Sequence, residues 1–283
     1  MILLIVAFIG LIIAAYADIK TREVPDWLNY GLIFVGIGGR LIFSLVEFDF
    51  SYLIEGLLGF IIFLVLAYIM YYTGQWGGGD SKMLMGLGAL IGLQLRLDSL
   101  LVSFFVNALF IGAIYGLIYS LVLAFSNRKK FVKELKKMFS KKIVIRVRRF
   151  ILIVVLLLVV ILLFNKDYVI RILLLILSLV FLLGFYVYVF VQVVENSCMF
   201  KYVKPMKLTE GDWIAKDVKV NGKYITGPKD LGIEKKQIRA LVKFYRKGKV
   251  KKILVKYGIP FVPSFLVAFI ISLIFGNLIF VFI

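Results

Sequence analysis

Long apolar runs dominate the pattern of hydrophobic and polar positions along this chain. Soluble helices carry an apolar stripe with a period near 3.6 residues, whereas these runs are apolar on every side over lengths that cross a bilayer. They predict eight spans, at residues 2–17, 27–46, 51–73, 81–95, 99–125, 150–165, 168–194 and 260–283. The fourth span is short and rich in Gly and Met, which suits a helix surrounded by other helices.

A polar segment at 126–149 interrupts the runs. Its apolar residues share one helical face with lysines around it: Phe131, Val132, Leu135, Met138 and Phe139. This pattern favours a basic interfacial helix on an anionic lipid surface. So basic a stretch also suits nucleic acid, but its place beside a span makes the bilayer the expected partner, and we expect no nucleic-acid partner.

The second polar segment, 195–258, predicts a small cytoplasmic α+β domain. Asn221-Gly222 lies between two short apolar stretches and is a hairpin-turn signal. An amphipathic helix is predicted around Leu241 and ends at Gly248.

The expected fold is therefore an all-α, polytopic membrane helical bundle of about eight spans with one small α+β insertion. We expect residues 1–125 and the helix at 259–283 to form the membrane core. Residues 150–194 form a membrane helical hairpin in this interpretation.

Composition agrees with an integral membrane protein, since 62% of the 283 residues are hydrophobic and the formal net charge is +19. Soluble domains lie nearer half apolar. The first run lacks a basic start, and Asp18 and Lys20 follow it in place of a small-residue cleavage site. We therefore expect a retained first helix and not a secretory signal.

The distribution of Lys and Arg predicts the orientation. With the N-terminus outside, the cytoplasmic segments are 18–26, 74–80, 126–149 and 195–258. The basic residues that then lie outside, of 35 in the chain, are Arg40, Arg96, Lys166 and Arg171. By the positive-inside rule we expect a multi-pass protein of the cell membrane, with both termini outside.

Asp18 and Asp80 are the candidate catalytic residues. Carboxylates are costly in a bilayer, and those retained near it are functional candidates. Asp18 ends a helix that runs inward and Asp80 begins one that runs outward, so both lie at the cytoplasmic rim of the bilayer. The plain alternative is that both carboxylates only cap helix ends.

The neighbours of Asp80 are also candidates. Gly77, Gly78 and Gly79 precede it, and a glycine backbone lets an extended substrate approach closely, although a glycine run is also an ordinary loop. Lys82 either stabilises the anionic pair, contacts substrate, or reaches lipid headgroups.

Two motifs resemble those of the type IV prepilin peptidase family, which are GxGD membrane aspartyl proteases. Asp18, Val24 and Pro25 fill the pattern Asp-x-x-x-x-x-(Ile/Val)-Pro, and Gly77, Gly79, Asp80 and Lys82 fill GxGDxK.

A third match, at 259–266, is similar to the opening of the family's last helix and includes Pro260 and Pro263. It differs by Val262 in place of a glycine and by an extra Ser264. The resemblance covers 1–125 and 259–283 but not 126–258.

The resemblance implies an aspartyl endopeptidase that removes short basic leaders from membrane-embedded precursors with type IV-pilin-like signal peptides. Asp18 and Asp80 would be catalytic, and the supporting residues would be Gly77, Gly78, Gly79, Lys82, Pro25, Pro260 and Pro263. No metal or cofactor is implied. Bacterial members often carry paired cysteines and methylate the new N-terminus. This chain has one cysteine and looks most like an archaeal preflagellin or prepilin peptidase that only cleaves.

Residue usage excludes several protease classes. The chain has no histidine, which excludes the HExxH metallopeptidases and the serine proteases that use a Ser-His pair. Cys198 is the only cysteine, which removes a cysteine-ligated zinc site and an intramolecular disulfide. Two close carboxylates that share a proton can instead activate water and polarise an amide carbonyl.

Two other functions remain open from sequence. An ion- or proton-coupled transporter would use Asp18 and Asp80 as cation ligands, although such folds usually carry an internal repeat and none is visible between the halves. An assembly scaffold would recruit cytoplasmic partners through 195–258. The oligomeric state and the true precursor are not determined by the sequence.

Overall fold

The computed structural model describes residues 1–282 and contains two compact units. The first unit is residues 1–116 together with the chain from Tyr202 onward, and the second is residues 117–201. Among the described residues, the helices long and apolar enough to cross a membrane are α1 (Ile2–Thr21), α2 (Asp26–Val46), α3 (Ser51–Tyr72), α5 (Leu100–Ser126), α7 (Lys142–Phe164) and α8 (Tyr168–Cys198). The prediction of a helical membrane protein with a small α+β insertion is therefore confirmed.

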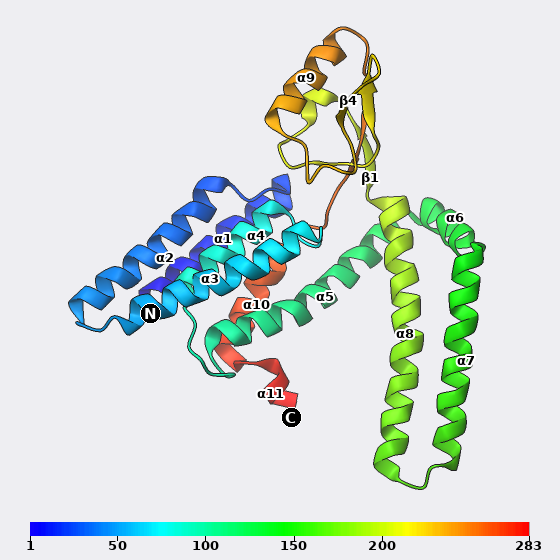
Figure 1. Ribbon diagram of the computed structural model, residues 1–283, viewed down its shortest axis with the longest axis horizontal. Helices are drawn as coiled ribbons and strands as arrows, with labels where there is room; N and C mark the ends of the chain where they lie inside the picture. Colours follow the sequence, from blue (N-terminus) through cyan, green and yellow to red (C-terminus); the bar gives the residue numbers. More distant parts are fainter. Residues whose placement is uncertain (283) are drawn as a thin grey trace. The chain divides into compact units, whose positions relative to one another are not determined.

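The membrane part of the first unit is a bundle of helices (Figure 1). Its elements are α1 (Ile2–Thr21), α2 (Asp26–Val46), α3 (Ser51–Tyr72), α4 (Gly78–Ile91), the first part of α5 (Leu100–Ser126), α10 (Val262–Phe275) and α11 (Leu278–Phe282). The short helix α4 packs against α2 and α3, and its residues from Met83 to Ile91 are almost all buried. A helix of 14 residues is too short for a lipid-facing span but suits this protein-lined position.

Small residues let α4 approach α3 closely. A side chain on Gly59 of α3 would collide with the carbonyl of Gly88 in α4, and one on Gly88 would collide with the carbonyl of Gly59. Close backbone approach at small residues is a common basis of helix packing within membranes. The two glycines therefore fix the position of the helix that carries Asp80.

The last apolar run, expected as one helix at 259–283, is broken at Gly276, where φ is 68°. Asn107 of α5 stabilises the break: its Nδ2 donates to the Gly276 carbonyl at 2.8 Å, and its Oδ1 accepts from the Leu278 N–H at 3.0 Å. Hydropathy alone could not show the break, because the residues on both sides are equally apolar.

The insertion has a three-stranded sheet, a hairpin and one helix. The sheet has the order β1-β5-β2, with β1 at Phe200–Val203, β2 at Trp213–Ile214 and β5 at Ile253–Lys256. β2 and β5 are antiparallel, with Trp213 opposite Lys256. A 3₁₀ turn, η1 (Pro205–Lys207), follows β1.

The predicted hairpin is confirmed as β3 (Val218–Val220) and β4 (Lys223–Thr226). Its turn residues Asn221 and Gly222 both have positive φ, 53° and 76°, as a two-residue hairpin turn requires. The predicted helix is α9 (Lys235–Arg246), which buries Leu241, and Gly248 follows it with a φ of 72°. The insertion therefore has its own small core, formed by Val203, Leu208, Ile214, Ile233, Leu241, Ile253 and Val255.

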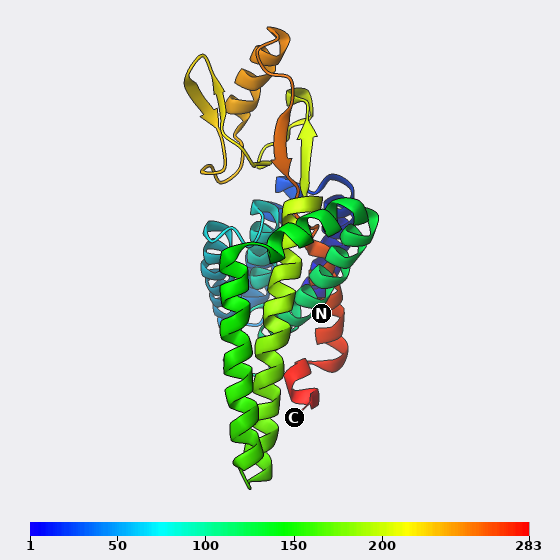
Figure 2. The same cartoon turned by 90° about the vertical axis from the view of Figure 1, so that its right-hand side faces the viewer.

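The second unit contains the long antiparallel hairpin of α7 (Lys142–Phe164) and α8 (Tyr168–Cys198), which both views show side by side (Figures 1 and 2). The interfacial segment forms α6 (Arg128–Phe139), and α7 already begins at Lys142. Part of the apolar face of α6 packs on a neighbouring helix, where Met138 is buried against Val189 and Val193 of α8. The lysines of α6 remain on its outer side.

Candidate active site

Asp18 lies in the last turn of α1 and is only 4% exposed. Its Oδ2 accepts a hydrogen bond from the backbone N–H of Val262, the first residue of α10, at 3.0 Å. The N-terminus of a helix carries unpaired N–H groups and a partial positive charge, so it is a favourable partner for a carboxylate. The beginning of α10, which follows the insertion in the chain, therefore holds the Asp18 carboxylate in place.

Asp80 is the third residue of α4 and is partly exposed. Its Oδ2 accepts a hydrogen bond from the N–H of Gly77 at 3.2 Å, so the carboxylate caps the first turn of its own helix. The capping role, which the sequence offered as the plain alternative, is thus present for Asp80. The hydrogen bond occupies one oxygen of Asp80, and the residue remains partly exposed.

The two carboxyls stand on adjoining ends of packed helices. Asp18 lies in the last turn of α1 and Asp80 in the first turn of α4, α1 packs against α4, and Gly79 next to Asp80 lies against Val24. Two carboxyls brought together in a partly dry site do not both ionise readily. This is the arrangement that general acid–base hydrolysis by two carboxyls requires.

The three glycines do not form an extended strip. Gly77 has an extended backbone, but Gly78 and Gly79 already belong to the first turn of α4. A Cβ on Gly79 would lie 3.2 Å from the backbone N of Val24, whereas one on Gly78 would meet only the Tyr71 ring at 3.6 Å. Gly79 is therefore the position where the two motifs touch.

Lys82 contacts the beginning of α2. Its Nζ lies 2.6 Å from Oδ1 of Asp26 and over the ring of Tyr30, both at the beginning of α2. Pro25 is the N-cap residue of that helix. Lys82 thus joins α4 to α2, and Pro25 begins α2.

The remaining predicted prolines lie beside Asp18. Pro260 is buried in the connection that leads to α10, and Pro263 stands in the first turn of that helix, where its missing N–H is not needed. The Val262 N–H between them stays available to Asp18.

Sequence reasoning missed several residues that support the site. Asn29 of α2 is fully buried and donates from Nδ2 to the Gly79 carbonyl at 3.4 Å. Arg40, expected outside, is 7% exposed and donates to the carbonyls of Ala89 and Leu90 at the C-terminal end of α4. The sequence did contain a signal for Arg40, since it lies inside the predicted span 27–46. A charged residue inside a membrane helix usually has a partner within the bundle.

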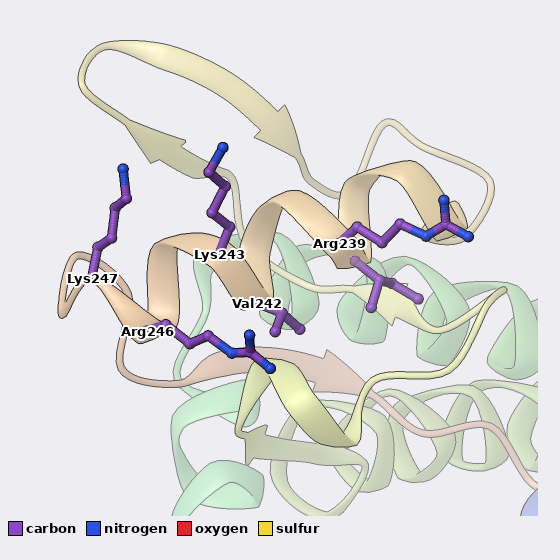
Figure 3. Close-up of a pocket in the computed structure, with 6 residues that line it drawn as sticks. Arg239, Val242, Lys243, Arg246 and Lys247 are labelled. Atoms are coloured by element: carbon purple, nitrogen blue, oxygen red, sulfur yellow. The ribbon is translucent and has the colours of Figure 1, made fainter.

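Other features lie outside this site. No group of three or more His, Cys, Asp or Glu side chains that could hold a metal ion occurs among the described residues. A surface hollow of about 570 Å³ on α9 is lined by Ile238, Arg239, Val242, Lys243, Arg246 and Lys247 (Figure 3). None of these belongs to a segment that carries a candidate catalytic residue.

The part of the chain that contains both aspartates matches a known protein family. Residues 5–121 match the type IV leader peptidase family, which confirms the resemblance carried by the two motifs. The chain is similar to the preflagellin peptidase of Methanocaldococcus jannaschii, 41% identical over 91 residues, and to that of Methanococcus maripaludis, 41% identical over 87 residues. It is also similar to the preflagellin peptidase of Methanococcus voltae, 37% identical over 86 residues.

These matches are partial. They cover 32%, 31% and 30% of this chain and 38%, 37% and 36% of the three relatives, so the chain aligns with little more than a third of each relative's length. The family match ends at residue 121, before the insertion and α10.

Proposed function

We propose that this chain, whose residues 5–121 match the type IV leader peptidases, is a membrane-embedded aspartyl endopeptidase. It removes short basic leader peptides from preflagellin- or prepilin-like precursors, with Asp18 and Asp80 as the catalytic pair. The observation that carries the proposal is the packing of α1 against α4, with Gly79 of the second motif against Val24 of the first, which brings together the segments that bear the two carboxyls.

The chemistry requires one ionised and one protonated carboxyl. The ionised partner takes a proton from water, and the protonated one donates a hydrogen bond to the scissile carbonyl. The backbone N–H groups of Val262 and Gly77 each hold one oxygen, so helix ends and not mobile side chains orient the pair. Such preorganisation favours a fixed attack geometry.

The substrate class follows from the depth of the site. Asp18 lies in the last turn of α1 and Asp80 in the first turn of α4, so the pair lies at one end of these helices. The excess of Lys and Arg on the segments at this level orients it toward the cytoplasm of a cell membrane, with both termini outside. A precursor with a basic leader and a following apolar helix places its junction at the same level.

The test is cleavage of a membrane-embedded preflagellin by purified enzyme in liposomes. Asp18→Asn and Asp80→Asn are isosteric, and each should leave the precursor uncleaved while the protein stays folded. Asp98→Asn, at an exposed ion pair with Arg96, is the control and should cleave normally. Cleavage that survives either of the first two changes would remove that aspartate from the catalytic pair. A folded wild-type protein that cleaves no such precursor would refute the function.

A further inference from the structure

The insertion makes contact with the segment that follows Asp18. The guanidinium of Arg22 donates from Nη1 to the Gly258 carbonyl at 2.7 Å, and its Cζ lies 5.1 Å from the centre of the Tyr257 ring. Arg22 is the C-cap residue of α1, and its own N–H donates to the Asp18 carbonyl at 2.8 Å. Its left-handed backbone, with φ of 60°, is uncommon for a residue with a side chain.

This contact and the Asp18 hydrogen bond fasten one stretch of chain at both ends. Residues 257–262 leave strand β5 of the insertion and enter α10. Arg22 holds the stretch at Gly258, and Asp18 holds it at Val262. The position of the last insertion strand therefore sets where the Val262 N–H meets the Asp18 carboxylate.

The insertion also contacts the segment that precedes Asp80. The Tyr71 hydroxyl, at the end of α3, donates to the Leu231 carbonyl at 3.0 Å. The indole of Trp213 in β2 lies against Gly74, within 3.4 Å of the point where a Cβ would stand. The Tyr71 ring in turn lies against Gly78, the first residue of α4.

We propose that the insertion is a clamp on the catalytic pair, and that Arg22 and Tyr71 are the positioning residues through which it acts. The clamp joins the segment after Asp18 and the segment before Asp80 through one small folded domain. The proposal rests on the proposed peptidase function. It assigns to residues 202–258, which include the Gly258 acceptor of Arg22, a role in orienting the two carboxyls that is separate from binding the leader.

Kinetics with single variants test the clamp. Tyr71→Phe removes only the hydroxyl, and Arg22→Gln removes the charge and the long donor. Each should lower kcat about 3- to 30-fold, since each loses one hydrogen bond and a small misplacement of the pair slows chemistry. KM should stay within about twofold, because neither side chain is assigned to the substrate. Arg22→Lys keeps the charge and should recover part of kcat.

Matched controls come from neighbouring residues. Tyr72→Phe makes the same change one residue later, where the hydroxyl interacts with Tyr68 of the same helix. Lys20→Gln removes an exposed charge that contacts only Tyr16 within α1 in the described contacts. Both controls should leave kcat unchanged. Equal kcat in Tyr71→Phe, Arg22→Gln and wild type would overturn the clamp.

Hydrogen exchange separates failure of the clamp from failure of the peptidase function. In the double variant Tyr71→Phe with Arg22→Gln, the amides of 73–79 and 257–262 should exchange at least threefold faster than in wild type, while those of α2 stay unchanged. This readout needs no substrate. Unchanged exchange in both segments would overturn the clamp even if the wild-type protein cleaved no precursor.

Discussion

Arg40 provides a quantitative test of how the bundle holds α4. Its guanidinium is buried at the C-terminal end of that helix, where it donates to the carbonyls of Ala89, Leu90 and Ile91 and pairs with Glu55 at 3.4 Å. The last carbonyls of a helix have no partners within the helix. A cation at this end is also stabilised by the partial negative charge of the helix dipole. Arg40→Met keeps most of the volume but leaves these carbonyls and the Glu55 charge without their partner.

Arg40 is 7% exposed, and its loss leaves the last carbonyls of α4 without a donor at about 1–3 kcal/mol each, so we expect Arg40→Met to destabilise the protein by about 3–5 kcal/mol. Glu55→Gln should cost much less, because Arg40 keeps its carbonyl acceptors. Unfolding by SDS in mixed micelles, followed by tryptophan fluorescence, measures both changes. A loss below about 1 kcal/mol for Arg40→Met would refute this description of the α4 end, because exposed pairs already reach that value.

Three further predictions concern the site. Gly79→Ala should lower kcat by about tenfold or more in the liposome cleavage assay, because the new methyl group would press on Val24, whereas Gly78→Ala should stay within about threefold. Lys82→Gln and Asp26→Asn should have equal and small effects on cleavage, and the double variant should be no worse than either, since the two side chains pair with each other. Loss of cleavage with Lys82→Gln alone would instead assign the lysine to the catalytic pair. The wild-type rate should show a bell-shaped dependence on pH, because a pair that shares one proton works only between its two titrations, and the control Asp98→Asn should keep the same profile.

The sequence predicted the features that depend on local pattern. Hydropathy located the spans, because a bilayer demands long apolar helices, and Asn221-Gly222 located the hairpin, because few residues accept its positive φ values. The two aspartates emerged as candidates because ionisable residues are rare at membrane depth. Each of these signals lies within about 20 residues of chain.

The features that the sequence could not predict join distant parts of the chain. The hydrogen bond between Asp18 and Val262 joins residues that are 244 positions apart in the sequence. The Asn107 hydrogen bonds that stabilise the break at Gly276 join α5 to the last helices. The apolar face of α6 was predicted correctly as a face, but its burial against α8 depends on tertiary packing. A lipid surface and a neighbouring apolar helix present the same chemistry to such a face.

The meeting of Asp18 and Asp80 is the claim on which the function depends, and cross-linking tests it most directly. In a Cys198→Ser background, Asp18→Cys with Asp80→Cys should be joined within one chain by a short bifunctional thiol reagent, once each single cysteine has been shown to react. Mass spectrometry should then find the peptides that contain residues 18 and 80 linked. Asp18→Cys with Asp98→Cys serves as the unlinked control. A folded, reactive Asp18→Cys with Asp80→Cys variant that yields no internal link would contradict the catalytic pair.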